Sequence, residues 1–156
     1  MEIRRFKQGD EEELYRLFYN TIRKVNVKDY SEDQVQAWAP DDIDMDFVTQ
    51  KFRDISPFVA VKDEKIIGYA DIQPDGYIDH FYCHHQFQGK GVGRFLFAAI
   101  EKEAMKKGIP GMYSNVSVTA RPFFEAMGFS VEKEQLVTVG DQQLTNYRMV
   151  RAHEHS

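Results

Sequence analysis

The chain has 156 residues, with 20 basic and 25 acidic side chains and a formal net charge of −5 at pH 7. That length suits one globular domain, and an aromatic content of 13% with a modest net charge excludes a disordered chain. The longest apolar run falls far short of the about 18 residues of a membrane-spanning helix, and the N-terminus lacks the apolar stretch of a signal peptide. The acidic balance argues against nucleic-acid binding, and the single cysteine, Cys83, fits a reducing compartment. We therefore expect a cytoplasmic protein without membrane or nucleic-acid partners.

The first third of the chain predicts one short strand followed by three helices. The strand covers residues 3–6, and apolar residues at helical spacing predict a first helix from about 10 to 25. Ser31 is a candidate N-cap for a second helix, which ends before Pro40 because the residue preceding proline is disfavoured in the α conformation. A shorter third helix is expected over residues 44–52.

The remainder alternates strands with two further helices. Its expected elements are a hairpin of strands 58–61 and 66–72, a strand at 77–83, a helix at 91–107, a strand at 112–116, a helix at 119–127, and two closing strands at 130–139 and 144–151. This order predicts an α/β (α+β) fold in which helices cover the faces of a single mixed sheet. Residues 1–151 are assigned to one domain and residues 152–156 to a short polar tail.

The most informative segment is a glycine loop between a strand and a helix. The strand ends at Cys83, and Gly89, Gly91 and Gly93 then occur within five positions before the helix begins. Glycines allow successive backbone N–H groups to converge on one point, and a helix N-terminus adds free N–H groups and a positive dipole end. Lys90 would add positive charge beside them. The segment therefore predicts a pyrophosphate site built mostly from backbone.

Two familiar glycine loops fit this segment poorly. A nucleotide-hydrolysing P-loop requires Gly-Lys followed by Ser or Thr, and Gly91-Val92-Gly93 does not supply it. The dinucleotide fingerprint requires a third glycine where this chain has Arg94. A dinucleotide oxidoreductase is therefore a weaker alternative, as is a glycine turn that binds nothing.

Two motifs together resemble the GNAT superfamily of N-acetyltransferases. Residues Gln88–Gly93 match the pattern Gln/Arg-x-x-Gly-x-Gly/Ala of the family's acyl-coenzyme A loop, and Ala120–Phe129 resembles its second motif, Ala-x-x-Phe-Tyr-x-x-x-Gly-Phe. The opening Ile3-Arg4 and the strand 78–83 also fit the family, so the resemblance covers nearly the whole chain. It implies a mostly antiparallel sheet of about seven strands with four or five helices. It also implies transfer of an acetyl group from acetyl-CoA to a primary amine of a small molecule or peptide, by direct attack in a ternary complex.

The resemblance also implies which residues hold the cofactor. Main-chain groups of Phe81 and Cys83, at the end of a central strand that splays from its neighbour, would bond the pantetheine arm. The Cys83 side chain is expected to be a small buried apolar group, since direct transfer needs no acyl-enzyme. The implied cofactor-binding residues are Phe81, Tyr82, Cys83, Gln88, Gly89, Lys90, Gly91, Val92, Gly93, Arg94, Asn115, Ser117, Phe123 and Phe124.

Asp79 is the preferred general base, because an amine attacks only after losing its proton. Strand alternation places Asp79, Phe81 and Cys83 on one face, with His80 and Tyr82 on the other. Desolvation within an aromatic strand would raise the pKa of Asp79 toward a useful range. A structural hydrogen-bond acceptor is an equally good interpretation of Asp79, and His80 is the second candidate base.

One residue departs from the family pattern. The family's frequent general acid is the Tyr of the second motif, and this chain has Phe124 there. Ser117, Tyr113, Tyr82 or solvent would then protonate the leaving thiolate. The departure also motivates an alternative function, a non-catalytic acyl-CoA-binding regulatory module.

The acceptor side is less well defined. In this architecture the helices after the first strand wall the acceptor pocket, and Tyr19, Tyr30 and Trp38 are its candidate residues. With the acidic pair Asp41-Asp42 they would suit a cationic amine, although core aromatics and a solvated turn explain them equally well. A homodimer is compatible with the sequence.

We expect no metal site. Adjacent His84 and His85 lack nearby cysteine or acidic ligands, and His153 with His155 suits a solvated tail.

Overall fold

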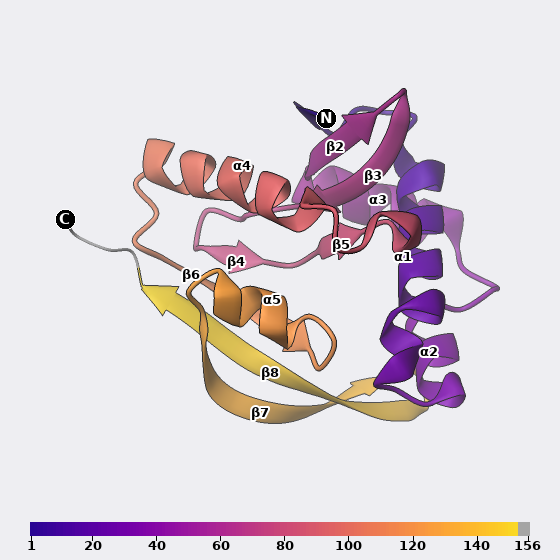
Figure 1. Cartoon of the computed structure of the whole chain (residues 1–156). Helices are drawn as coiled ribbons and strands as arrows, with labels where there is room; N and C mark the ends of the chain where they lie inside the picture. The colour runs from indigo at the N-terminus through magenta and orange to yellow at the C-terminus, as the bar shows by residue number, and fades with distance from the viewer. Residues whose placement is uncertain (153–156) are drawn as a thin grey trace.

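A computed structural model describes residues 1–152, which form two four-stranded sheets and five α-helices (Figure 1). The expected elements form with ends shifted by a few residues at most, except the strand predicted at 77–83, which is two strands. Residues 153–156, including the predicted tail histidines, lie outside the described residues. The elements are β1 (Glu2–Arg5), α1 (Glu11–Lys24), η1 (Asn26–Lys28), α2 (Glu32–Trp38), α3 (Met45–Ile55), β2 (Phe58–Lys62), β3 (Lys65–Ala70), β4 (Tyr77–Ile78), β5 (Phe81–Cys83), η2 (His85–Phe87), α4 (Val92–Lys106), β6 (Gly111–Ser117), α5 (Arg121–Ala126), β7 (Ser130–Val139) and β8 (Gln142–Ala152).

The strands divide into two sheets, which corrects the expectation of one seven-stranded sheet. Sheet one has the order β1-β2-β3-β5 and is antiparallel throughout. Sheet two has the order β4-β6-β8-β7, with β4 parallel to β6 and the other pairs antiparallel. Because β4 belongs to one sheet and β5 to the other, the sheets part between β5 and β6.

One buried carboxylate, that of Asp71, lies at the break between β4 and β5. Asp71 Oδ1 accepts hydrogen bonds from the backbone N–H groups of Asp79, at 3.0 Å, and His80, at 2.6 Å. Both N–H groups therefore bond a side chain in place of a backbone carbonyl. Sequence patterning alone shows only a continuous β-rich run at 77–83, because the interruption arises from tertiary contact.

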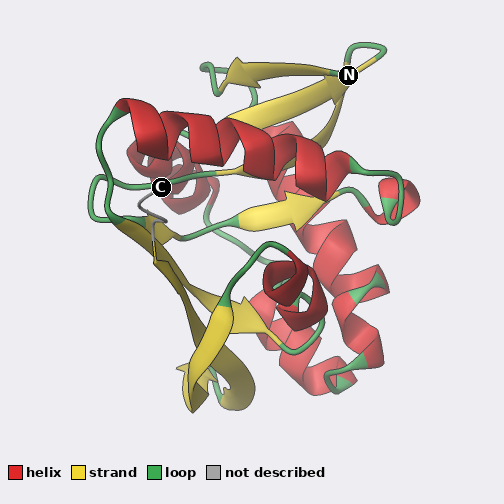
Figure 2. Ribbon diagram, turned by 60° about the vertical axis from the view of Figure 1, so that its left-hand side comes forward, coloured by secondary structure: helices red, strands yellow, loops and turns green. Residues whose placement is uncertain are grey.

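Helices cover both faces of sheet one. Leu96 and Ile100 of α4 pack against one face, and Figure 2 shows α4 lying across these strands. Leu14 of α1 and Phe52 of α3 pack around Tyr69 on the opposite face. Burial of these apolar side chains is the main stabilising contribution to the layers. No helix within residues 1–152 is long and apolar enough to cross a membrane.

Gly68 of β3 lets the N-terminus of α4 approach the sheet closely. A Cβ atom at this position would lie 2.9 Å from Leu96 Cδ1 and 2.9 Å from Val92 Cγ1, closer than packed carbon atoms approach. The glycine therefore brings the first turn of α4 against β3, which pairs directly with β5. This packing fixes the glycine loop beside the open edge of β5.

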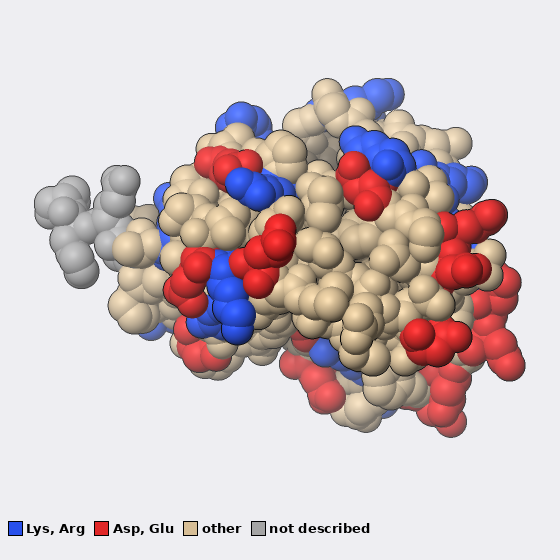
Figure 3. All heavy atoms as spheres, turned by 90° about the horizontal axis from the view of Figure 1, so that it is seen from below, with Lys and Arg blue, Asp and Glu red and all other residues tan. Residues whose placement is uncertain are grey.

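Negative charge is concentrated on the α1–α2 side of the molecule. Residues 29–46 contain seven acidic side chains, all exposed, and no Lys or Arg. Acidic side chains gather at the right-hand edge of Figure 3, the side on which α1 and α2 lie in Figure 1. The seven are Asp29, Glu32, Asp33, Asp41, Asp42, Asp44 and Asp46. We call residues 29–46 the acidic segment.

Candidate active site

A cavity of about 370 Å³ lies where β5 and β6 part. It brings together β5, the glycine loop, the start of α4, β6 and α5. Among the residues expected to hold the cofactor, it is lined by Phe81, Tyr82, Cys83, Gln88, Gly89, Gly91, Val92, Gly93, Arg94, Asn115, Ser117, Phe123 and Phe124. Lys90 is not part of the lining, and its Nζ lies 5.5 Å from the centroid of the Phe87 ring.

The edge of β5 that faces the cavity carries main-chain groups without a strand partner. His84 N–H donates to the Ile67 carbonyl at 2.8 Å, so alternate residues of β5 face β3. Phe81 and Cys83, which lie opposite Ala70 and Gly68 of β3, are therefore in non-hydrogen-bonded pairs. Their N–H and C=O groups point away from β3. No described strand pairs with that edge. It can bind an extended chain as though it were another strand.

The Cys83 carbonyl is already engaged at this edge. It accepts hydrogen bonds from Thr21 Oγ1 at 2.9 Å and Gln88 Nε2 at 2.8 Å. These contacts fix α1 and the glycine loop to the end of β5. Burial raises the pKa of the Cys83 thiol to about 12, which leaves a protonated, weakly nucleophilic group.

The glycine loop presents a concentration of free backbone donors. Gly89 (φ +72°) and Gly91 (φ +83°) are left-handed, a conformation that glycine adopts without the usual steric cost. Across Gln88–Arg94, no backbone N–H donates a hydrogen bond to an acceptor within residues 1–152. Gly91 is also the N-cap of α4, so the positive end of the helix dipole adds to these donors. Together with the Arg94 side chain, they form a site for an anionic group.

Aromatic rings close the cavity beneath the loop. A Cβ atom on Gly93 would lie 2.8 Å from Phe123 Cε1, so glycine is required for the loop to rest on this ring. The Phe81 ring centroid lies 5.3 Å from that of Phe123 and 5.6 Å from that of Phe124. Phe124 is buried in this cluster and has no proton to donate.

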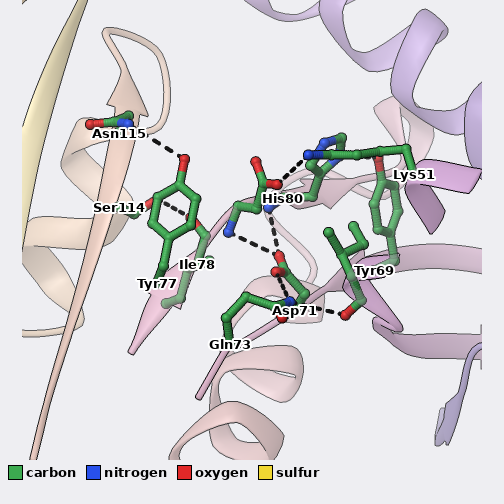
Figure 4. Close-up of polar contacts among 11 residues, drawn as sticks. Lys51, Tyr69, Asp71, Gln73, Tyr77, Ile78, His80, Ser114 and Asn115 are labelled. Atoms are coloured by element: carbon green, nitrogen blue, oxygen red, sulfur yellow. Dashed lines mark hydrogen bonds and ion pairs between the residues drawn. The ribbon is translucent and has the colours of Figure 1, made fainter. Parts of the chain in front are cut away.

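Asp79 lies at the strand break and lines the cavity. Its side chain is 22% exposed, and its Oδ2 lies 2.5 Å from Lys51 Nζ of α3 (Figure 4). Sequence reasoning did not identify Lys51. It precedes Asp79 by 28 residues on a separate helix, and no local pattern connects the two.

His80 lies on the other side of β5 and does not line the cavity. Its ring stacks on Phe18, with centroids 5.7 Å apart, and its Nδ1 lies 3.0 Å from the Tyr69 hydroxyl. Burial lowers the pKa of His80 to about 4, so the ring is neutral near pH 7. The structure therefore places Asp79, and not His80, beside the other cavity groups.

Of the three candidate acceptor residues, only Trp38 lines the cavity. The Tyr30 hydroxyl donates to the Thr145 carbonyl at 2.6 Å and accepts from Val118 N–H at 2.8 Å. Tyr19 bonds the Asp41 carboxylate near the surface. These two tyrosines tie loops and strands together outside the cavity.

Five side chains with a hydroxyl group line the cavity. Three of them already donate their proton, Thr21 to the Cys83 carbonyl, Ser114 to the Ile78 carbonyl and Thr119 to the Asp29 carboxylate. The other two are Ser117 and Tyr82. Ser117 Oγ accepts from Ala120 N–H at 3.0 Å and retains its own proton. Burial raises the pKa of Tyr82 well above that of an exposed phenol, which keeps it protonated. Tyr113 lies outside the lining, and its hydroxyl donates to Asp75 Oδ2 at 2.5 Å.

The adjacent histidines pack against each other. The His84 and His85 rings stack with centroids 4.5 Å apart, and His84 Nδ1 accepts from Gln86 N–H at 3.0 Å. Within residues 1–152, no group of three or more His, Cys, Asp or Glu residues is arranged to hold a metal ion.

The parting of the two sheets, the free edge of β5 and the donor-rich loop at a helix N-terminus together form a site for an extended ligand with an anionic end. A family model described as "Acetyltransferase (GNAT) domain" matches residues 26–150. The chain therefore belongs to the GNAT acetyltransferase family, whose members take the acetyl group from acetyl-CoA.

Similar proteins match over nearly their whole length. YafP of Escherichia coli K12, described as an uncharacterized N-acetyltransferase, is 26% identical over 155 residues, covering 99% of this chain and 98% of YafP. A GCN5-related N-acetyltransferase structure from Rhodopseudomonas palustris has a TM-score of 0.92 at 26% identity, covering 97% of this chain and 95% of that chain. The PaiA N-acetyltransferase of Thermoplasma acidophilum, solved in complex with coenzyme A, has a TM-score of 0.76 at 21% identity, covering 97% and 98%.

Proposed function

We propose that this acetyltransferase acetylates the primary amine of a cationic small molecule or peptide by direct attack in a ternary complex. One observation carries the proposal. Asp79 lines the same cavity as the free β5 edge and the glycine loop, so a base and both parts of an acyl-CoA site face one space.

The cavity fits acetyl-CoA by the chemistry of its donors. The free N–H groups of Gln88–Arg94 and the Arg94 side chain suit a pyrophosphate, and the open edge of β5 suits the pantetheine amides. Phe123 and Phe124 provide an apolar wall beside that arm. Bound acetyl-CoA supplies a thioester, whose carbonyl carbon forms a bond to the amine nitrogen as its bond to sulfur breaks.

Asp79 accepts the proton that the acceptor ammonium must lose, directly or through one water. Lys51 holds the carboxylate at the cavity wall. The main-chain N–H groups of Phe81 and Cys83 are the donors available to developing negative charge on the carbonyl oxygen. Among the cavity hydroxyls, those of Ser117 and Tyr82 are not already donating to Cys83, Ile78 or Asp29, and the departing sulfur can receive a proton from either.

The acidic segment supports a cationic acceptor. Its seven exposed carboxylates flank Trp38 in the sequence with no Lys or Arg among them, and Trp38 lines the cavity. One of the seven, Asp41, pairs with Arg23 of α1 at 3.6 Å, so the other six supply the net negative charge. A surface field of one sign raises the local concentration of oppositely charged ligands. The Trp38 ring can also bind a cation through its face.

A second function, acyl-CoA binding without catalysis, is favoured by Phe124 alone, since this residue removes the family's usual proton donor. Release of free thiol from acetyl-CoA in the presence of a panel of monoamines, polyamines and basic peptides separates the two functions. Acetylation predicts amine-dependent thiol release and an acetylated amine detected by mass spectrometry. Coenzyme A binding without turnover across the panel would favour the binding module.

A further inference from the structure

Asp71 is a fully buried carboxylate that directly follows β3. Three donors reach it. Backbone N–H groups of Asp79 and His80 bond Oδ1, at 3.0 and 2.6 Å, and Gln73 Nε2 bonds Oδ2 at 2.7 Å (Figure 4). Its own N–H donates to the His80 carbonyl at 3.2 Å. A buried charge is costly unless hydrogen bonds compensate it. The three donors compensate the Asp71 carboxylate, and they need both of its oxygens.

We propose that Asp71 is the positioning residue for the acetyl-transfer site, because its carboxylate opens the β5–β6 cleft and fixes Asp79 within it. This inference rests on the proposed function. Asp71 replaces a backbone carbonyl as the partner of Asp79 and His80, so β4 stays with β6 while β5 stays with β3. Without Asp71, the N–H groups of Asp79 and His80 would need backbone carbonyl partners, as they would have in a continuous strand.

The same network reaches the partner of Asp79. Gln73 Nε2 also donates to the Ile55 carbonyl at 3.1 Å, at the last residue of α3. Lys51 lies about one turn earlier on that helix and forms the ion pair with Asp79. Asp71 therefore fixes the backbone of Asp79 directly and, through Gln73, the helix that supplies Lys51.

The titratable groups around Asp71 can be named from each packed element. Asp79 and His80 face it from the strand break, and Lys51 lies beyond Asp79 on α3. Tyr69 lies two residues earlier on β3, and Tyr77 lies nearby on β4. Burial, the largest effect, raises the pKa of Asp71 to about 6, with the adjacent Asp79 charge adding to it. Protonation of Asp71 near that pH weakens the acceptor for both N–H groups.

The test compares D71N with D75N. Asp75 is a matched control, because its carboxylate also accepts a backbone N–H, that of Tyr77 at 3.0 Å, but in an exposed turn. For D71N we expect kcat for the acceptor amine to fall roughly 10²-fold, as for a misplaced reacting group, with the coenzyme A Kd within about threefold of wild type. D75N should keep both values. Wild-type kcat should decline below about pH 6, and D71N should lack that decline.

An NMR titration tests the geometry without reference to activity. In the wild type, the amide protons of Asp79 and His80 should shift together with a midpoint near pH 6, and in D71N that step should vanish. If no amine is acetylated but the shared step is present, the proposed function fails while the cleft-opening role of Asp71 stands. Wild-type kcat in D71N, or equal losses of kcat and coenzyme A affinity, would overturn the positioning role.

A second variant covers the case in which D71N does not fold. Q73L keeps the Asp71 carboxylate but removes the two hydrogen bonds that Gln73 Nε2 donates, to Asp71 Oδ2 and to the Ile55 carbonyl. The lost hydrogen bond stabilises the ionised form of Asp71, so its loss should raise the pH midpoint of the shared Asp79 and His80 amide step. Q73L should also lower kcat, by less than D71N does. An unmoved midpoint with unchanged kcat would contradict the network.

Discussion

Replacement of Gly91 by alanine tests the glycine loop as the anion site of the cofactor. Gly91 has φ +83°, and a Cβ atom there would meet no heavy atom within 4 Å, so the perturbation is conformational and involves no clash. A left-handed L-residue costs roughly 1–2 kcal/mol. When coenzyme A is absent the exposed loop can relax, and on binding it must return to the left-handed shape, so this cost appears in the coenzyme A Kd. The Kd should rise about 5- to 30-fold, measured by isothermal titration calorimetry at fixed salt.

The matched control is Gly108→Ala. Gly108 has φ +66°, also has no heavy atom within 4 Å of a Cβ position, and lies beyond the far end of α4. Gly108→Ala should lower the free energy of unfolding by the same roughly 1–2 kcal/mol that a left-handed alanine costs, while its coenzyme A Kd stays at the wild-type value. A wild-type Kd in Gly91→Ala, or an equal weakening in both variants, would refute the assignment of the loop to phosphate binding.

Three further predictions concern the base, the acceptor and the buried acid. Asp79→Asn should lower kcat about 10²- to 10⁴-fold with little change in coenzyme A affinity, and unchanged turnover would remove Asp79 as the base. The KM of a polyamine should rise when the NaCl concentration is raised from about 50 to about 300 mM, because the acidic segment attracts the polyamine electrostatically and salt screens that attraction. A KM that does not change with salt would show that the segment does not steer the acceptor. The pKa of Asp71 is about 6 in the folded chain, against an ordinary value of 3.8. The folded chain therefore binds this proton first, and the contribution of Asp71 to the free energy of unfolding should increase as the pH falls through 6 toward 4. Urea unfolding should show a wild-type gain between pH 7 and 4.5 that exceeds that of D71N by about 2 kcal/mol, and a difference of opposite sign would contradict the raised pKa.

Local sequence signals predicted the parts of the candidate site that are made from contiguous residues. The strand ending at Cys83, the glycines and the helix start lie within one short segment, and the structure places this segment along one wall of the cavity. The second motif likewise placed Phe123 and Phe124 in the lining. Such features depend on backbone conformation and chain order, which the residue types express directly.

The parts that depend on contacts between distant residues were not predictable. Asp71 occurs at the end of a β-rich run, and nothing nearby indicates that its carboxylate will take two N–H groups eight and nine residues later. Lys51 resembles any solvated helical lysine until α3 packs beside Asp79. Tyr30 looked suited to a binding pocket because it is aromatic, but its hydroxyl is used by Thr145 and Val118.

The most direct test of the whole account is one reaction with both substrates present. Wild-type protein, acetyl-CoA and a polyamine are mixed, and thiol release, acetylated amine and the intact mass of the protein are followed together, with Asp79→Asn in parallel. The account predicts one acetylated amine per thiol released, no acetyl group on the protein, and a strongly reduced rate in the variant. Thiol release without acetylated amine, or an acetylated Cys83 that forms before the amine is added, would contradict it.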